Sequence, residues 1–368
     1  MERTRVAIVG AGPIGIELAV ALKREGVDYV HLDAGQVGST IQWYAPGTKF
    51  FSSPERIAIA GVPLVTPGQD KAIREQYLAY LRAVVDQFDL AIRTYTRVES
   101  TRRAEDGFVL ESVPSSHGVG GPGDMDRSPY ESNTSPSLLH ARRVVLAIGD
   151  MHRAQLLGIP GEDLPHVSHF FDDPHVYFRR RVLIVGGKNS AAEAALRCHR
   201  VGADVTISYR GQRFDPKRVK YWVRPELEWL IDKGRISFLP GTQPVRITPD
   251  AVRLERIAGS GESTGGPIEV ATDFVLLLTG YEQDASLFES LGVDLVGPQR
   301  RPRLNHATME TNVPGLYVAG TAVGGTQAGG VKIFIENSHV HVDRIVASIL
   351  GRKPPPQRDQ AEESLPES

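Results

Sequence analysis

The sequence contains one cysteine, Cys198, and this sets the first limit on its chemistry. An intramolecular disulfide is impossible, and so is a two-thiol relay built from the chain's own residues. Because Cys198 falls in a segment with helical spacing, we interpret it as a small buried hydrophobic residue. Redox chemistry on a protein thiol is therefore not expected.

Long apolar runs and an excess of charge of one sign are also absent. No stretch reaches the roughly 18 to 20 apolar residues that span a bilayer. Met1 leads directly into a short apolar strand, without the apolar stretch and cleavage site of a signal peptide. The formal net charge is -2, so nothing favours a nucleic acid or a membrane surface as a partner. We expect a cytoplasmic protein that binds small molecules.

Five histidines are candidate chemical groups, but their spacing fits no metal site. They are His169, His175, His306, His339 and His341. We expect no metal, and we expect these side chains to have surface or capping roles. The alternative is that one of them donates a proton to a reduced acceptor.

The chain repeats one pattern twice, a short apolar strand followed by a glycine turn, a helix and a second strand. The first copy covers 6–32 and the second covers 182–209. A chain of 368 residues also exceeds a typical domain of roughly 100 to 200 residues. These features predict an α/β fold with two Rossmann-like, doubly wound dinucleotide-binding domains.

The first glycine turn, Gly10-Ala11-Gly12-Pro13-Ile14-Gly15, is a G-x-G-x-x-G motif in the expected place between a strand and a helix. Its glycines allow a pyrophosphate to approach the backbone, and the helix offers unpaired N–H groups to the phosphates. Asp33 ends the second strand, where a carboxylate can accept hydrogen bonds from ribose hydroxyls. The unit is predicted to bind an adenine dinucleotide.

The second turn, Gly186-Gly187-Lys188-Asn189-Ser190-Ala191, is a weaker match, with Lys188 where a second glycine usually stands. No acid follows its second strand. Arg210 and Arg213 come there instead, and they can bind the 2′-phosphate that distinguishes NADPH from NADH. NADPH is therefore the predicted ligand, and a solvated surface pair of arginines is the alternative.

Small residues also end later strands. Gly149 and Thr279-Gly280 follow strands at similar distances after the two fingerprints, and they let a nucleotide approach the backbone. Gly320-Thr321 precedes a glycine-rich stretch and can bring N–H groups to a flavin or its phosphate. Phe50 lies where an aromatic ring can stack on a flavin, with core packing as the alternative.

The order of these segments predicts a first domain that is interrupted by the second. We place the first domain at 1–165 and 295–350, and the second at 166–294. Residues 114–137 are rich in Ser, Gly and Pro and are predicted to form a flexible loop. Residues 351–368 have little to bury and are predicted to be a disordered tail.

Several short motifs occur together in one order along the chain. They are Phe50-Phe51-Ser52-Ser53, Val62-Pro63, Pro160-Gly161-Glu162-Asp163-Leu164-Pro165, Gly186-Gly187-Lys188-Asn189-Ser190, Tyr209-Arg210-Gly211, Thr279-Gly280-Tyr281, Met309-Glu310-Thr311-Asn312-Val313 and Ile333-Phe334-Ile335-Glu336-Asn337. Over residues 4–350 the chain resembles the thioredoxin reductase-like flavoproteins, and within them the YpdA group of bacillithiol disulfide reductases. The resemblance implies FAD in the first domain, NADPH in the second, a small disulfide as electron acceptor, and a homodimer.

Two positions depart from the pattern of that group. Its members carry a cysteine before the last glycine of the first turn, where this chain has Ile14. Many flavoproteins of this type also have an aspartate that binds the ribityl chain, where this chain has Thr321. A thiolate route to a disulfide is closed at Ile14, so no catalytic residue is assigned.

The fold alone does not fix the acceptor. The first hypothesis is an NADPH-dependent FAD enzyme that reduces a low-molecular-weight disulfide or a similar acceptor. A ferredoxin- or flavodoxin-NADP reductase and a flavin monooxygenase are the enzyme alternatives. A nucleotide-binding redox sensor with vestigial catalysis is the alternative from another class.

Overall fold

The computed structural model describes residues 1–115, 136–257, 266–327 and 332–353. By contacts the chain divides into two units. Unit 1 comprises 1–43, 47–153 and the described residues from Tyr281 onward, and unit 2 comprises 44–46 and 154–280. The domain boundaries predicted from the sequence, at 165 and 294, lie further along the chain than the boundaries in the structure, at 153 and 280. The predicted flexible loop and disordered tail lie for the most part outside the described residues.

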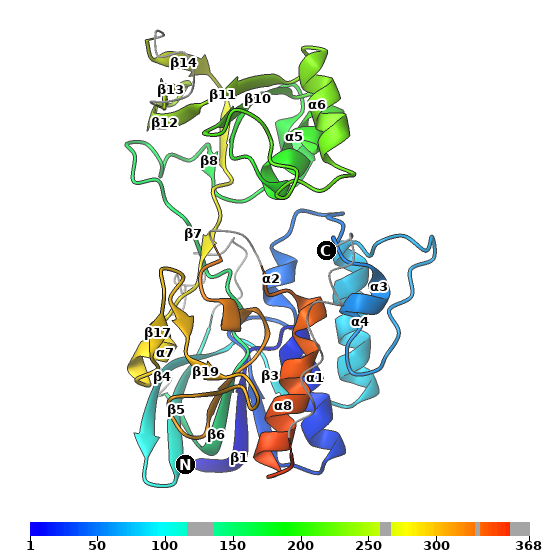
Figure 1. The fold of residues 1–368 in the computed structure, drawn as a ribbon, viewed down its shortest axis with the longest axis vertical. Helices are drawn as coiled ribbons and strands as arrows, with labels where there is room; N and C mark the ends of the chain where they lie inside the picture. The colour runs from blue at the N-terminus through cyan, green and yellow to red at the C-terminus, as the bar shows by residue number, and fades with distance from the viewer. Residues whose placement is uncertain (116–135, 258–265, 328–331, 354–368) are drawn as a thin grey trace. The chain divides into compact units, whose positions relative to one another are not determined.

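Unit 1 contains a mixed sheet with helices on one face (Figure 1). Its elements are β1 (Glu2–Val9), α1 (Pro13–Arg24), β2 (Tyr29–Leu32), α2 (Ser39–Gln42), α3 (Pro54–Ile57), α4 (Arg74–Gln87), β3 (Ile92–Arg93), β4 (Thr96–Ala104), β5 (Gly107–Pro114), β6 (Ser137–Leu146), α7 (Ser286–Ser290), β17 (Leu295–Val296), β18 (Arg301–Pro302), β19 (Leu304–Asn305), β20 (Glu310–Thr311), β21 (Leu316–Val318), η3 (Gly320–Gly324), η4 (Ile335–Asn337) and α8 (His339–Ile349).

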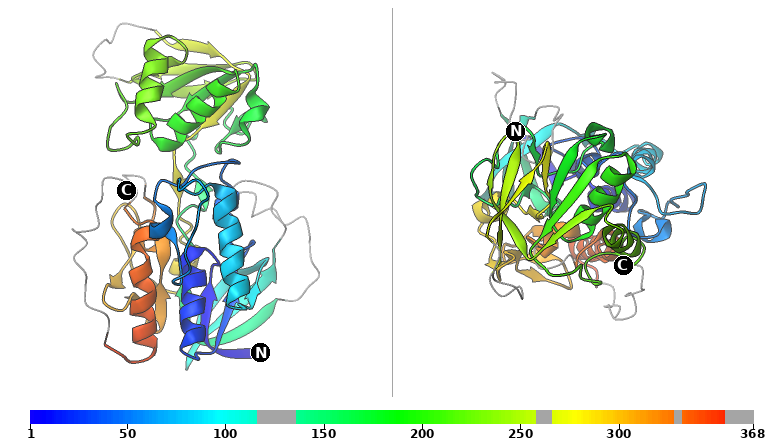
Figure 2. Two further views of the ribbon diagram at one scale, coloured as in Figure 1. Left: turned by 90° about the vertical axis from the view of Figure 1, so that its right-hand side faces the viewer. Right: turned by 90° about the horizontal axis from the view of Figure 1, so that it is seen from above.

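The sheet of unit 1 is parallel at β3-β2-β1-β6-β21 and antiparallel elsewhere. β1 lies inside this sheet and pairs in parallel with β2 on one side and β6 on the other. β21 in turn pairs in parallel with β6. Val6, Ala7 and Ile8 are fully buried, as expected for a parallel strand that is covered on both faces. α8, α1 and α4 lie side by side over the sheet (Figure 2). The carboxyl ends of β1, β6 and β21 are therefore neighbours.

Unit 2 is a second parallel sheet with strand order β11-β10-β9-β15-β8, accompanied by an antiparallel sheet of β12, β13 and β14. Its elements are β8 (Val167–Ser168), η2 (Pro174–Tyr177), β9 (Arg181–Val185), α5 (Asn189–Arg200), β10 (Asp204–Tyr209), α6 (Arg224–Asp232), β11 (Ser237–Pro240), β12 (Thr242–Ile247), β13 (Ala251–Arg256), β14 (Ile268–Ala271) and β15 (Phe274–Leu277). The short strands β7 (Arg153–Ala154) and β16 (Tyr281–Glu282) stand where the chain passes between the units.

Alternate residues of β9 supply the two faces of the unit 2 core. Val182 and Ile184 pack in the cluster formed with α5 and α6. Leu183 and Val185 pack in a second cluster with residues of β12 and β13. This alternation follows from the pleat of a strand that is covered on both sides.

Candidate functional site

The first glycine turn packs tightly against the strand ends around it. A Cβ on Gly10 would lie 2.4 Å from the carbonyl oxygen of Ala147, and φ of Gly10 is +108°. A Cβ on Gly15 would lie 2.0 Å from the carbonyl oxygen of Gly10. Backbone atoms would have to shift in both cases, so the first and third positions of the motif require glycine for steric reasons within the protein itself.

Gly12 differs from the other two glycines of the motif, because a Cβ at Gly12 would meet nothing within 4 Å. Gly12 is the N-cap of α1, has φ -73°, and lacks a side chain that could cap the helix. The first turn of α1 carries no acidic residue and begins with Pro13. Open space therefore lies beside a helix end whose N–H groups have no partners within the helix, which suits an anionic phosphate.

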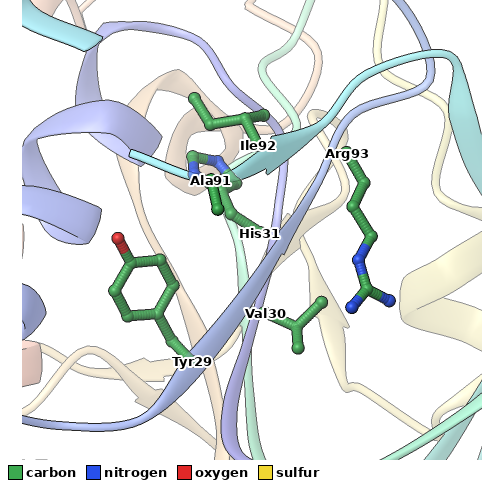
Figure 3. Close-up of a pocket in the computed structure, with 6 residues that line it drawn as sticks. All are labelled: Tyr29, Val30, His31, Ala91, Ile92 and Arg93. Atoms are coloured by element: carbon green, nitrogen blue, oxygen red, sulfur yellow. The ribbon is translucent and has the colours of Figure 1, made fainter. Parts of the chain in front are cut away.

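His31, on β2, supports the first glycine turn, a role that no sequence pattern indicates. Its Nε2 lies 2.9 Å from the carbonyl oxygen of Gly10 and must donate to it. Burial lowers the pKa of His31 to about 4, so the ring is neutral. His31 also lines a shallow pocket of about 160 Å³ between β2 and β3 (Figure 3). Its other lining residues, Tyr29, Val30, Ala91, Ile92 and Arg93, belong to neither predicted nucleotide site.

Asp33 lies at the end of β2, where an acid was predicted, and its carboxylate already holds the local backbone. One oxygen accepts from the Ala11 amide at 2.5 Å and the other from the Gly35 amide at 2.7 Å. Burial raises the pKa of Asp33, while these amides and the Ser39 hydroxyl oppose the rise. A carboxylate has about four acceptor positions, so the two amides and the Ser39 hydroxyl leave capacity for one ribose hydroxyl.

Ile14 and Gly320 bring the first turn against the turn that follows β21. A Cβ on Gly320 would lie 3.5 Å from the Cβ of Ile14, whose side chain is 5% exposed. The Gly320 amide donates to Nδ1 of His341 at 3.2 Å. Burial and nearby positive charge lower the pKa of His341 to about 3, so this ring is a neutral acceptor. His341 therefore caps the turn after β21 from a buried position.

Gln283 joins the turns that follow β6 and β21. Its Nε2 donates to the carbonyl oxygens of Gly149 and Ala322 at 2.9 and 3.0 Å. Asp150, next to Gly149, accepts hydrogen bonds from the Thr321 hydroxyl and from Nε2 of Gln327. The predicted residues Gly149, Gly320 and Thr321 are thus brought together at adjacent strand ends.

Phe50 is positioned by α4. Its ring lies 4.5 Å, centre to centre, from the ring of Tyr77, which is fully buried. The backbone amide of Phe50 also donates to the carbonyl oxygen of Ala72. This packing shows the core contact that was the alternative to flavin stacking, and it leaves the stacking role a prediction.

The second glycine turn has Ala191 at its last position, where steric contact in the first turn requires Gly15. A Cβ on Gly186 would approach Leu278 and the Cβ of Ala191 at 2.7 and 3.0 Å, so the turn is already packed against Ala191. Gly187 is buried beneath the ring of Tyr209, which a Cβ would meet at 2.1 Å. The degraded motif of unit 2 therefore forms a compact turn with its own packing.

The helix that follows this turn begins within a group of positive charges. Lys188 is the N-cap of α5, and the first turn of the helix has no acidic residue. Burial, then the charges of Arg218 and Arg210, lowers the pKa of Lys188. Arg210 and Arg213 are exposed. Lys188 and Arg210 were predicted for this site, and the structure adds Arg218.

The remaining predicted residues of unit 2 lie at the same strand ends. The Asn189 side chain accepts from the Lys220 amide at 2.8 Å, and Ser190 is exposed. The Thr279 hydroxyl donates to the Gln155 carbonyl oxygen at 2.8 Å, and the Gln155 amide donates to Gly280. Because β15 pairs with β9, the Thr279-Gly280 turn lies beside the second glycine turn.

The sequence matches the family described as pyridine nucleotide-disulphide oxidoreductase over residues 7–116 and 124–320. The chain belongs to this family. It is 34% identical to bacilliredoxin reductase Bdr of Bacillus subtilis over 354 residues, covering 96% of this chain and 99% of that protein. It is also 27% identical to a ferredoxin–NADP reductase of Ignicoccus hospitalis, covering 85% of this chain and 88% of the relative.

This pyridine nucleotide-disulphide oxidoreductase is also similar to solved structures. The bacillithiol disulfide reductase Bdr (YpdA) of Bacillus cereus has a TM-score of 0.84 and 31% identity, covering 96% of this chain and 100% of that chain. Thioredoxin reductase of T. acidophilum, at 19% identity and a TM-score of 0.68, shares the fold. The predicted α/β fold and YpdA resemblance are confirmed. The chain is a flavin-dependent oxidoreductase that uses a nicotinamide nucleotide.

The lone cysteine of this oxidoreductase is buried, as predicted. Cys198 lies on α5 and is 0% exposed, and burial raises the pKa of its thiol to about 12. Among the other candidate histidines, His175 and His306 are exposed, and His169 lies 3.7 Å from Glu162. In the part of the chain that the structure describes, no helix is both long and apolar enough to cross a membrane.

His339, on α8 of this oxidoreductase, is linked to α1 through one ring nitrogen and to α3 through the other. Nδ1 lies 2.7 Å from Oε2 of Glu17, and Nε2 lies 3.1 Å from the carbonyl oxygen of Arg56. Both partners are acceptors, so both bonds form only when the imidazole is protonated. Burial alone would lower the pKa of His339, but Glu17, the Arg56 carbonyl and Asp343 raise it above its ordinary value.

We expect the His339–Glu17 pair to make the free energy of unfolding depend on pH. A raised pKa in the folded state gives stabilisation that is fully present below the unfolded pKa of about 6.5 and is lost as pH rises through the folded value. His339→Gln should therefore lower stability by about 1 kcal/mol at pH 6 and by less at pH 9. Thermal unfolding of both proteins across this range measures the difference, with exposed His175→Gln as control. A stability difference between wild type and His339→Gln that is the same at every pH would contradict this expectation.

Proposed function

We propose that this chain is an NADPH-dependent FAD enzyme that passes electrons to a low-molecular-weight, disulfide-type acceptor. The observation that carries the proposal is the pair of unlike glycine turns. One turn has open space at Gly12 and an acid at Asp33, whereas the other lies among Lys188, Arg210 and Arg218. The first suits ribose and pyrophosphate, and the second suits a nucleotide with an added phosphate.

In unit 1 the strand ends would hold FAD. The N–H groups at the start of α1 would bind its pyrophosphate, and Asp33 would accept from its ribose. Gly149, Gly320 and Thr321 would form the part of the site beyond the pyrophosphate. The buried bonds of His31 and His341 to Gly10 and Gly320 keep these turns in place without adding charge.

In unit 2 the start of α5 would hold the NADPH phosphates, with Gly186, Gly187, Asn189, Ser190 and Ala191 forming the turn. Arg210 and Arg213 would bind the 2′-phosphate, since a guanidinium can make two parallel hydrogen bonds to it. Thr279 and Gly280 would line the adjacent strand end. The bound flavin supplies the capacity to accept a hydride from NADPH and to release two electrons to another molecule.

Reduction of the acceptor would proceed without a protein thiolate. Ile14 stands where members of the YpdA group carry a cysteine, and the Cys198 thiol is buried with its pKa raised to about 12. Converting a disulfide to two thiols takes two electrons and two protons. NADPH supplies both electrons and one proton as a hydride, and solvent supplies the second proton.

An anaerobic titration of the purified flavoprotein with NADPH and with NADH tests this proposal. We expect NADPH to bleach the visible flavin absorbance at lower concentration than NADH, and a small disulfide to restore it. Absence of bound flavin, or no bleaching by either nucleotide, would overturn the assignment. Slow bleaching alongside tight binding of both nucleotides would favour a redox sensor.

A second candidate function is a ferredoxin–NADP reductase. It is favoured by the similarity to the I. hospitalis enzyme and by the absence of a thiol at Ile14, because a one-electron protein acceptor needs no protein thiol. The same reduced protein distinguishes the candidates. Rapid reoxidation by ferredoxin with none by small disulfides would support the reductase, and oxygen consumption only with an added organic substrate would indicate a monooxygenase.

A further inference from the structure

Asp150 joins the ends of two adjacent strands in unit 1. It follows Gly149 after β6, and β6 lies between β1 and β21 in the sheet. One oxygen of its carboxylate accepts from Nε2 of Gln327 at 2.8 Å. The Thr321 hydroxyl, from the turn after β21, donates to the same carboxylate. The acid therefore lies among the residues predicted to contact a flavin.

The surroundings of this carboxylate are neutral. Among the described residues no charged side chain shifts the pKa of Asp150. Burial raises that pKa, while Thr321, Gln327 and a backbone N–H oppose the rise. A carboxylate has about four acceptor positions, and three neutral donors, the Thr321 hydroxyl, the Gln327 amide and a backbone N–H, leave about one of them unfilled. A mostly buried acid with an unfilled acceptor position is costly unless another donor approaches. That condition favours a ligand with hydroxyl groups.

Gln327 cannot turn to relieve this arrangement. Its Oε1 accepts from the Lys332 and Ile333 amides at 2.7 and 3.0 Å, which fixes the amide nitrogen toward Asp150. On the other side, Gln283 holds Gly149 to the turn after β21. The carboxylate is thus held in place before a ligand binds, which reduces the entropy that binding would lose.

We infer that Asp150 is a flavin-positioning residue whose carboxylate accepts hydrogen bonds from the hydroxyl groups of the flavin's polyol chain. Many flavoproteins of this type have a carboxylate where this chain has Thr321, in the turn after β21. Asp150 would supply a carboxylate from the neighbouring turn after β6. This inference rests on the proposed FAD site. It adds a carboxylate that the glycine fingerprints and the motifs of the resemblance do not contain.

Asp150→Asn tests the inference, because the amide keeps the size of the side chain and one acceptor oxygen while the charge is lost. Hydrogen bonds to a charged group are worth more than neutral ones, so the Kd for FAD should rise about tenfold or more. Apoprotein would be titrated with FAD by flavin fluorescence. Asp86→Asn, an exposed acid on α4, removes the same charge and should leave the Kd unchanged.

A flavin analogue distinguishes ligand contact from a structural role. Wild type should bind FAD that lacks one ribityl hydroxyl more weakly than it binds FAD. Asp150→Asn should bind the two ligands with about equal affinity. If Asp150→Asn lowers the apoprotein Tm and leaves the FAD affinity intact, the residue only joins the strands and the inference is wrong. If wild type binds no FAD, the proposed function fails as well, so the two failures are distinguishable.

Discussion

Gly12→Asp is expected to abolish flavin binding while leaving the apoprotein folded. A Cβ at Gly12 meets nothing within 4 Å and φ is -73°, so the side chain fits without strain. Aspartate is also a favoured N-cap, which would stabilise α1. The same carboxylate would stand beside the proposed pyrophosphate, where like charges about 4 Å apart cost about 1 to 4 kcal/mol. Steric exclusion adds to this, so FAD affinity should fall at least about 100-fold.

Gly68→Asp provides the matched control. Gly68 is exposed in unit 1, and a Cβ added there would also meet no atom within 4 Å, so it receives the same charge away from the strand ends. The flavin content of both purified variants, their FAD titrations and the apoprotein Tm values would be compared. Loss of flavin only in Gly12→Asp, with no fall in Tm, is the expected result. If Gly12→Asp kept normal FAD affinity, the assignment of the pyrophosphate to this turn would be wrong.

The first glycine turn could be predicted from sequence because its requirements are local. A strand, three glycines and a helix occur in consecutive residues, and the clash of Gly15 with Gly10 explains the third glycine. The supports of the turn were not predictable, because they come from distant parts of the chain. His31 appears in sequence as one polar residue in an apolar strand, and its bond to Gly10 depends on the pairing of β1 with β2.

Gln283 and Asp150 illustrate the same limit. Gln283 is 134 positions from Gly149, and only the packing of β6 beside β21 makes one amide reach both turns. The histidines show the reverse problem, since a residue's pKa depends on neighbours that its sequence position does not reveal. His339 and His341 are two residues apart, yet the carboxylate of Glu17 raises the pKa of the first and burial lowers that of the second.

Arg210→Ser is expected to remove most of the preference for NADPH over NADH. Arg210 and Arg218 both lie close enough to Lys188 to lower its pKa, which places these positive charges together at the start of α5. A hydrogen bond to a charged group contributes about 1.5 to 3 kcal/mol, so the Kd for NADPH should rise about 10- to 100-fold. NADH has no 2′-phosphate, and its affinity should change little.

Arg235→Ser is the control for charge, because Arg235 is exposed in the same unit and its removal alters net charge equally. The Kd values of both nucleotides would be measured for the three proteins at low and high salt. Since ions screen an exposed charge pair, the NADPH preference of wild type should shrink as salt rises, while Arg210→Ser should show little dependence. Equal loss of NADPH and NADH affinity would mean that Arg210 supports the fold of the turn, and that the 2′-phosphate is recognised elsewhere or not at all.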